Sequence, residues 1–225
     1  MSGGAWARTF AQLPKLAYGL LTGAEITLLL TACGFLVAIV LGLIFATMRT
    51  LPSRLTRVIA VVYVEVFRSV PVLTQLFIIY FGLASIGLRI PPIPAAIIGF
   101  GIYGGAYLTE VFRAGIEAVD RGQIEAAFTI GMTRLRAMRY IVLPQAVRIV
   151  LPPIGNFLVG LLKDTSIASA VAVAEMSFRA KMLVNQTYLS TQIYLLVALF
   201  YLAMSLPLSA LTRGLERRMG RAQAR

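Results

Sequence analysis

Charged residues are sparse in this chain, and one compact group of charged and hydroxyl-bearing residues interrupts an apolar run. Lys163, Asp164, Thr165 and Ser166 directly follow apolar residues and precede a stretch of small ones. A carboxylate in such a place can pair with the ammonium group of a small molecule, and hydroxyls can donate to its carboxylate. An ion pair between Asp164 and Lys163, or with another helix, that only braces the fold explains the pattern equally well.

Two pairs of opposite charge add a second kind of chemistry. Glu65 with Arg68, and Glu110 with Arg113, are spaced so that each pair meets on one helix face. We expect structural ion pairs at a gate rather than contacts with a substrate. Glu175 is either a gate residue on the opposite side or, as we favour, a structural one.

Most catalytic chemistry is excluded by what the chain lacks. It has no histidine, its single cysteine (Cys33) lies in an apolar run, and no GxxxxGK[ST] phosphate-binding loop occurs. We therefore expect no metal site, no catalytic residues and no enzymatic activity. The net charge of +12 is not gathered on a basic face interleaved with aromatic residues, so we expect no nucleic-acid partner.

The composition is that of a membrane protein. Hydrophobic residues make up 59% of the 225 residues, charged residues only 13%, and the mean hydropathy is +0.84. Each membrane-spanning helix needs about 20 apolar residues, and lipid forms its surroundings. We predict an all-α integral membrane protein with one transmembrane domain over residues 1–225. Its five predicted spans are residues 22–48, 69–86, 95–112, 147–162 and 192–211.

The segments between these spans carry breaks and charges. Residues 58–67 are predicted to form a helix at or entering the membrane interface, and residues 167–174 a broken or re-entrant segment. The loop 113–143 is too charged to span; it should form two short helices joined at Gly131, with Pro144 ending the pair before the fourth span. Most of the tyrosines are expected to anchor at the membrane interface: Tyr63, Tyr80, Tyr103, Tyr107, Tyr188 and Tyr194.

Within the third span, Gly101 and Gly105 form a GxxxG pair. Such a pair lets two helices approach closely. The sequence does not distinguish packing inside one subunit from a dimer face.

The basic residues predict the orientation. Fifteen of the 21 lysines and arginines fall in residues 49–68, 113–148 and 213–225. The positive-inside rule places these segments in the cytoplasm, and five spans then put the N-terminus outside and the C-terminus inside. The gate pairs would lie near the cytoplasmic ends of their spans.

The loop 113–143 carries the most specific motif. Glu125-Ala126-Ala127 is followed after three residues by Gly131 and, after nine more, by Ile141-Val142-Leu143-Pro144. This spacing resembles the EAA loop of the permease subunits of bacterial ABC importers. In that family the loop docks into a cleft of the ATPase subunit, which would make Glu125, Ala126, Ala127, Gly131, Ile141 and Pro144 the coupling residues. Phe128 departs from the pattern, where a smaller residue is expected.

Three further segments resemble the polar amino acid branch of this superfamily, which includes histidine, glutamine, arginine and cystine permeases. They are residues 65–71, 110–116 and 162–166, and the likeness covers roughly residues 20–212. The resemblance implies a type I importer fold in the bacterial inner membrane. It also implies a second permease subunit (identical or not), a pair of ATPases that bind ATP and Mg²⁺, a periplasmic binding protein and an amino acid substrate.

Two other functions remain open from the sequence. One is an ABC permease for another small solute, which the segments 65–71 and 163–166 disfavour. The other is a carrier or channel that works alone, although carriers often contain internal repeats and none is evident here. The sequence does not say which amino acid is carried.

Overall fold

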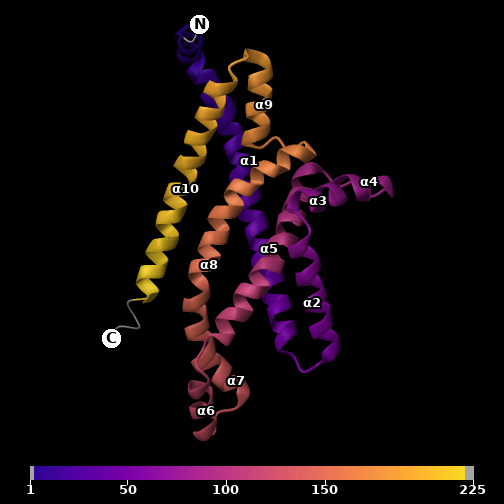
Figure 1. Ribbon diagram of the computed structural model, residues 1–225, viewed down its shortest axis with the longest axis vertical. Coiled ribbons are helices and arrows are strands. Elements are labelled where there is room, and N and C mark those ends of the chain that lie inside the picture. Colours follow the sequence, from indigo (N-terminus) through magenta and orange to yellow (C-terminus); the bar gives the residue numbers. More distant parts are fainter. Residues whose placement is uncertain (1–2, 221–225) are drawn as a thin grey trace.

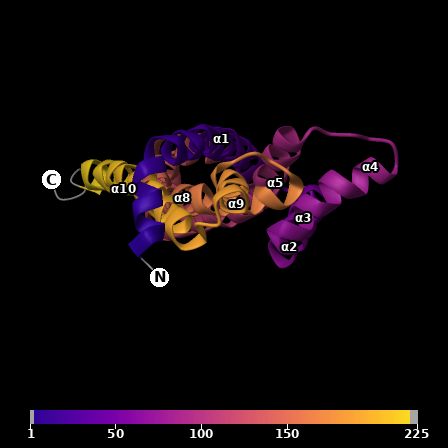
Figure 2. The ribbon, with the colours of Figure 1, turned by 90° about the horizontal axis from the view of Figure 1, so that it is seen from above.

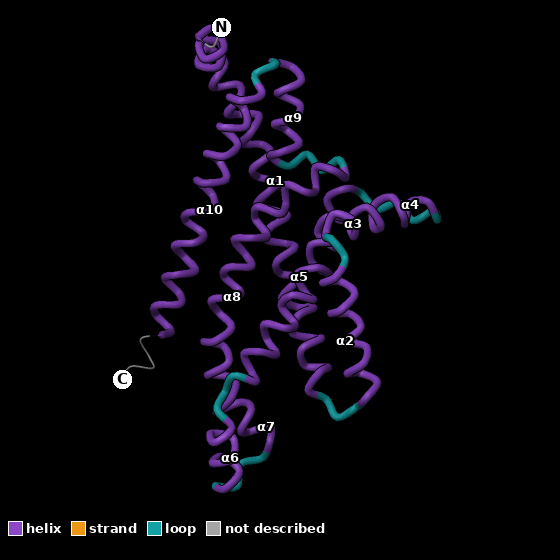
Figure 3. The backbone as a smooth tube through the Cα atoms, in the orientation of Figure 1, coloured by secondary structure: helices purple, strands orange, loops and turns teal. Residues whose placement is uncertain are grey.

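The computed structural model describes residues 3–220, and every regular element within that range is a helix (Figure 3). The predicted all-α fold class is confirmed. Arg221 and Arg225, which contributed to the predicted basic tail, lie outside the described residues.

The longest helix, α1 (Gly3–Thr50), runs through the centre of the molecule beside α5 (Pro92–Glu117) (Figure 1). Both extend past the predicted spans 22–48 and 95–112: α1 continues to Thr50, two residues before Pro52, and α5 continues to Glu117. In the Pro91-Pro92 pair, the second proline occupies the first helical position of α5, where a missing N–H costs nothing. These two helices form the frame of the bundle.

The second membrane segment is bent. Helix α2 (Arg54–Ser69) meets a second arm, Val72–Ser85, at 104°. The second arm consists of α3 (Val72–Phe77), the π-helical turn η1 (Ile78–Gly82) and α4 (Leu83–Ser85). The predicted span 69–86 therefore covers only this second arm. The predicted interfacial segment 58–67 is part of α2, and Pro71 marks the bend because proline cannot continue the hydrogen-bonded helix.

The fourth membrane segment begins in the charged loop. After α6 (Arg121–Thr129), a single helical stretch runs through α7 (Arg134–Ala137), the π-helical turn η2 (Met138–Val142), α8 (Leu143–Asp164) and the 3₁₀ turn η3 (Thr165–Val171). The prediction that Pro144 ends a helix is wrong. Its ring would clash with the carbonyl of Tyr140 in an α-helix, but Tyr140 lies in the wider π-turn, which accommodates the proline.

The chain leaves this segment through a sharp turn and returns along the bundle. Ala172 adopts a left-handed backbone conformation (φ 59°) directly after η3. Helix α9 (Met176–Thr187) and helix α10 (Ser190–Gly220) follow. The break predicted within residues 167–174 is confirmed at Ala172, whereas α10 extends past the predicted span 192–211.

Within the described residues, four helices are long and apolar enough to cross a membrane, or five if α2 and its bent second arm count as one span. The turn at residues 51–53 and the α6–α7 hairpin lie toward one end of the bundle, and the N-terminal end of α1 lies with α9 at the other (Figure 1). Seen from above, α10 and the α2–α4 segment lie on opposite sides of the central helices (Figure 2).

Glycines on α5 let it pack closely against α1. A Cβ atom on Gly105 would lie 2.6 Å from the hydroxyl of Tyr63 and 2.7 Å from Cβ of Leu41. A Cβ atom on Gly101 would overlap Val37 of α1. Both members of the GxxxG pair are therefore used for packing inside the chain, which decides between the two alternatives left open by the sequence.

Several of the tyrosines expected at the interface lie inside the bundle instead. The hydroxyl of Tyr63 donates to the carbonyl of Ile102 (2.7 Å), and its ring stacks on Phe45. Tyr107 stacks on Phe157 with ring centroids 5.2 Å apart, and Tyr103 packs against the same core. Gly105 of α5 leaves space for the hydroxyl of Tyr63, and this contact joins residues too far apart in the chain for the sequence pattern to reveal it.

The close α1–α5 contact predicts a matched pair of substitutions. Gly105→Leu should destabilise the fold by about 1–3 kcal/mol, the usual cost of overpacking. Gly160→Leu should be nearly neutral, since nothing lies within 4 Å of a Cβ atom there. Thermal unfolding of the purified chain in detergent measures both, and equal melting temperatures for the two variants would contradict the packing role of Gly105.

Candidate functional site

A network of ion pairs joins the ends of α1 and α5. The carboxylate of Glu110 accepts hydrogen bonds from Arg113 Nε (2.9 Å) and Nη2 (2.6 Å), and also pairs with Arg49 of α1. Arg113 binds Glu117 through its other nitrogen at 2.5 Å. The structure thus contains the Glu110–Arg113 pair predicted from the sequence. It adds Arg49, which lies 61 residues from Glu110 and which local spacing therefore could not indicate.

The second predicted pair is absent. Glu65 and Arg68 are both exposed, and neither forms an ion pair with any residue between 3 and 220. Arg68 is the penultimate residue of α2 and lies beside the bend, about 21 Å along the helix axis from Arg54 at the other end of the helix. It acts electrostatically on Tyr103 of α5. The predicted ion pair between Glu65 and Arg68 is therefore wrong for the described residues.

The structure separates the four residues of the 163–166 group. Lys163 is exposed in a groove between α8 and α10, which is also lined by Asn156, Arg213 and Glu216. Asp164 is half-buried on another side of α8 and acts on Tyr103, as Arg68 does. Thr165 is fully buried and donates to the carbonyl of Leu162 (2.7 Å).

This arrangement contains no ion pair between Asp164 and Lys163. Successive residues on a helix point about 100° apart, which explains why the two side chains diverge. Asp164, Arg68 and Tyr103 instead mark one polar region at the side of α5. This region holds one acidic and one basic group without a bridging ion pair.

Gln75 is a residue that the sequence analysis missed. It is buried, and its Nε2 atom donates to the carbonyls of Phe67 and Val70, each at 2.8 Å. These carbonyls lie at the bend between α2 and α3, where Pro71 interrupts the helical hydrogen bonds. A lone glutamine four residues after a proline in an apolar segment was the available signal, because a polar side chain inside a membrane needs a partner.

Glu175 has a structural position. It is fully buried as the N-cap of α9, where its carboxylate accepts from the backbone N–H groups of Phe178 (2.7 Å) and Ser177 (2.8 Å). Burial raises the pKa of this carboxyl, against the opposing effect of the two amide donors. The geometry agrees with the structural alternative for Glu175, since its oxygens are occupied by the helix end.

The hairpin formed by α6 and α7 has the two helices that the sequence predicted. Asp120 caps α6 by accepting from the N–H of Gly122 (2.6 Å), and Thr133 caps α7. Between the helices, Gly131 adopts φ +81°, a left-handed conformation that L side chains rarely adopt. The N–H of Gly131 closes α6 by donating to the carbonyl of Phe128 (3.0 Å).

The hairpin presents apolar side chains outward. Ile130 is 73% exposed, Leu135 78% and Phe128 43%. Glu125 and Ala126 are exposed on the same short helix, whereas Ala127 is buried. Apolar side chains clustered on an exposed hairpin are typical of a surface that docks onto a partner. Phe128, which departs from the expected motif, is part of this exposed surface.

A small core ties the hairpin to the bundle. Val119, Val142 and Ala146 are buried together, with Ile124 of α6 and Ile116 of α5 packed against them. The coupling candidates Ile141 and Pro144 lie directly beside this core, in η2 and α8. The hairpin is therefore packed against α5 on one side and against η2 and α8 on the other.

The structure is thus that of a helical membrane protein in which a charged hairpin packs against the ends of α5 and α8. The sequence matches the family "Binding-protein-dependent transport system inner membrane component" over residues 38–221. The chain belongs to this family.

The relatives are similar over nearly their whole length. The chain is 35% identical to the glutamine transport system permease protein GlnP of Escherichia coli (strain K12) over 216 residues, covering 95% of this chain and 97% of the relative. It is 38% identical to the L-cystine transport system permease protein TcyB of Bacillus subtilis (strain 168), covering 90% and 87%.

Solved structures agree with this placement. The crystal structure of an amino acid ABC transporter with histidines superposes with a TM-score of 0.89 at 36% identity, covering 93% of this chain and 98% of that one. An inward-facing MetNI methionine ABC transporter shares the fold, with a TM-score of 0.69 at 19% identity.

The two predicted gate pairs offer a direct comparison. Glu110→Gln should destabilise the fold by about 1–2 kcal/mol, because two arginines lose a charged acceptor. Glu65→Gln should change stability little, since Glu65 is exposed and forms no ion pair with a described residue. Thermal unfolding in detergent at constant salt measures both. A Glu65→Gln loss as large as that of Glu110→Gln would contradict the assignment of the ion pairs.

Proposed function

We propose that this chain is the permease subunit of an ATP-driven ABC importer that carries polar amino acids across the bacterial inner membrane. The observation that carries the proposal is the exposed α6–α7 hairpin, packed onto both α5 and α8 in a chain of this transporter family. Relatives that transport glutamine and cystine support an amino acid as the substrate. A permease for another solute or a carrier that works alone is not favoured.

In this proposal the chain crosses the membrane five times, with α2 and its bent second arm as one crossing. The N-terminus is outside, and the C-terminus and the hairpin are in the cytoplasm. The arginine-rich segments at one end of the bundle support this orientation through the positive-inside rule.

The partners follow from the family. A pair of ATPase subunits binds ATP and Mg²⁺ and docks onto the hairpin, while this chain performs no catalysis and holds no cofactor. A second permease subunit completes the central route, and a periplasmic binding protein delivers the amino acid. Glu125, Ala126, Ala127, Gly131, Ile141 and Pro144 are the proposed coupling residues; the exposed Phe128, Ile130 and Leu135 support docking at this hairpin.

The mechanism is alternating access driven from the hairpin. Closure of the ATPases pulls the two hairpins of the paired permeases together, and the shared core moves α5 and α8 as one body. The outward-open state receives the amino acid, and ATP hydrolysis resets the inward-open state.

The substrate contacts are proposed to centre on Asp164. Its carboxylate can pair with the α-ammonium group of an amino acid, and Arg68 lies in the same region with a charge suited to the carboxylate. Ser166 is a further candidate. Lys163 and Thr165 were also candidates, but the groove position of Lys163 and the occupied hydroxyl of Thr165 point to structural roles.

The function is tested by uptake into proteoliposomes that hold this chain, its ATPase partner and its binding protein. Labelled amino acids are supplied outside, with or without ATP on the ATPase side. ATP-dependent uptake of one class of amino acid is the expected result. Uptake that does not need ATP would contradict the proposal, as would an intact complex that carries only another class of solute.

Gly131 tests the coupling role of the hairpin. Gly131→Val should reduce ATP-dependent uptake at least about fivefold, because a left-handed conformation costs a non-glycine residue about 1–2 kcal/mol and β-branching adds to it. Gly131→Asn should retain most of the activity, since asparagine tolerates this conformation. Nothing lies within 4 Å of an added Cβ, so the difference reports on the backbone alone. Full activity of the valine variant, with normal membrane insertion, would refute the coupling role.

Asp164 tests the substrate region. Asp164→Asn should lower uptake about tenfold through a higher KM, because a charged hydrogen bond to the substrate is lost. Assembly with the ATPase, followed by co-purification, should be unchanged. Lys163→Gln serves as the control, because its side chain lies in a different groove. A fully active Asp164→Asn variant would move the substrate site elsewhere.

A further inference from the structure

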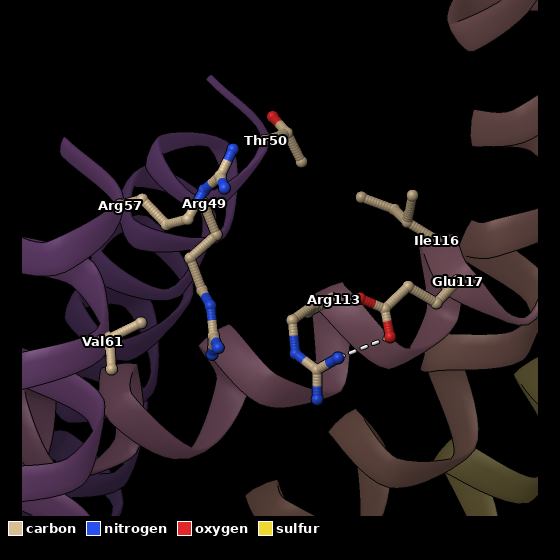
Figure 4. Close-up of a pocket in the computed structure, with 7 residues that line it drawn as sticks. All are labelled: Arg49, Thr50, Arg57, Val61, Arg113, Ile116 and Glu117. Carbon is tan, nitrogen blue, oxygen red and sulfur yellow. Dashed lines mark hydrogen bonds and ion pairs between the residues drawn. The ribbon is translucent and has the colours of Figure 1, made fainter. Parts of the chain in front are cut away.

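A pocket of about 250 Å³ opens where α1, α2 and α5 meet (Figure 4). Three of its lining residues are arginines, one from each helix: Arg49, Arg57 and Arg113. Figure 4 shows Arg49 extending toward α5 and Arg113 directed toward Glu117, one turn further along the same helix. The proposed function does not assign a role to this pocket.

The charges of the pocket do not cancel. Glu110 and Glu117 satisfy Arg49 and Arg113, whereas Arg57 is exposed and forms no ion pair with any residue in the described range 3–220. The lining holds three arginines and Glu117, and Glu110 lies behind them as the partner of Arg49 and Arg113; together these five groups leave one net positive charge. A ligand with a single negative charge would balance the group, and a guanidinium is well suited to the oxygens of a phosphate.

A second pocket of about 260 Å³ adjoins the first. The two share Thr50 and Ile116 as lining residues. The lining of the second pocket includes the buried residues Ala46, Ala146 and Val150 and the exposed residues Leu43 and Val147.

This second pocket is an apolar groove that runs up the bundle. Leu43 lies seven residues before Thr50 on α1, so that the groove extends about 10 Å away from the arginines along the helix axis. Leu43 and Val147 are each more than 40% exposed, and the groove is therefore open to lipid. A molecule with a charged head and an apolar tail could therefore contact the arginines and the apolar groove at the same time.

We propose that these two adjoining pockets bind one acidic phospholipid. Its phosphodiester lies among Arg49, Arg57 and Arg113, and one of its acyl chains lies in the groove between α1, α5 and α8. The continuity of the basic and apolar pockets favours a lipid over a soluble phosphate, which would use only the first. The single excess charge favours a headgroup of net charge −1 over a zwitterionic one.

A lipid at this site would lie next to the core that joins the α6–α7 hairpin to the bundle. The groove is lined by Ile116 and Met138, which also pack on the core that ties the α6–α7 hairpin to the bundle. An acyl chain there would contact α5 and the stretch η2–α8 together.

The experiment is lipid binding to the full-length chain in detergent, measured by native mass spectrometry. The probes are phosphatidylglycerol, phosphatidylethanolamine with the same acyl chains, and glycerophosphoglycerol, which is the first headgroup without its chains. Phosphatidylglycerol should bind at least about fivefold more tightly than phosphatidylethanolamine, and the free headgroup should compete only weakly. The readout does not use transport, so its failure is distinct from failure of the proposed function.

Two arginines on α2 provide a matched pair. Arg57→Gln should weaken phosphatidylglycerol binding about fivefold, the usual effect of one basic residue near an acidic headgroup. Arg54→Gln should have no such effect, since Arg54 is exposed on the same helix but does not line the pocket. Thermal unfolding of both variants without added lipid checks that they remain folded.

Four results would overturn the proposal. They are equal binding of the two lipids, equal losses in the two arginine variants, full competition by the free headgroup, and binding confined to monomers, which would assign the surface to a second copy of the chain.

Discussion

The close contact between α1 and α5 is the constraint on which the rest of the structure depends. Lipid provides no hydrophobic driving force between helices, so their association relies on close approach and van der Waals contact. Gly101 and Gly105 permit that approach, and Val37 and Leu41 of α1 occupy the space that side chains would otherwise fill. The α2 segment, α8 and the ion pairs of Glu110 are then placed against an already fixed pair.

Beyond this pair, the molecule must satisfy the backbone at every point where a helix is interrupted. Pro71 frees carbonyls at the bend, and the carboxamide of Gln75 binds two of them. Glu175 does the same for the amide groups that begin α9. The backbone around them thus explains the amide nitrogen of Gln75 and the carboxylate of Glu175, whereas no backbone group or ion-pair partner within residues 3–220 occupies the carboxylate of Asp164.

The sequence predicted those parts of the fold that depend on local chemistry. Gly131 indicated the turn of the hairpin, because its left-handed conformation is a local preference of glycine, and the apolar runs indicated the helices. Prediction from the sequence failed for contacts between residues that are distant along the chain. The Arg49–Glu110 pair joins residues 61 positions apart, Tyr63 lies inside because Gly105 of α5 leaves space for its hydroxyl, and Tyr107 lies inside because it stacks on Phe157 of α8. The Glu65–Arg68 spacing was correct for a helix face, but spacing alone does not decide whether two exposed side chains pair. The assignments of the coupling and substrate residues stay predictions.

The π-turn at Met138–Val142 also fixes the rotational phase between the hairpin and α8. A π-turn contains one residue more than the α-helical turn it replaces, so that deleting a single residue there would restore α-helical winding. Such a deletion would rotate the hairpin about 100° relative to α8. Chain length in this short stretch is therefore as constrained as side-chain identity. Insertions or deletions in the outer turns of the molecule would be tolerated, whereas at these five residues they would turn the hairpin to face another direction.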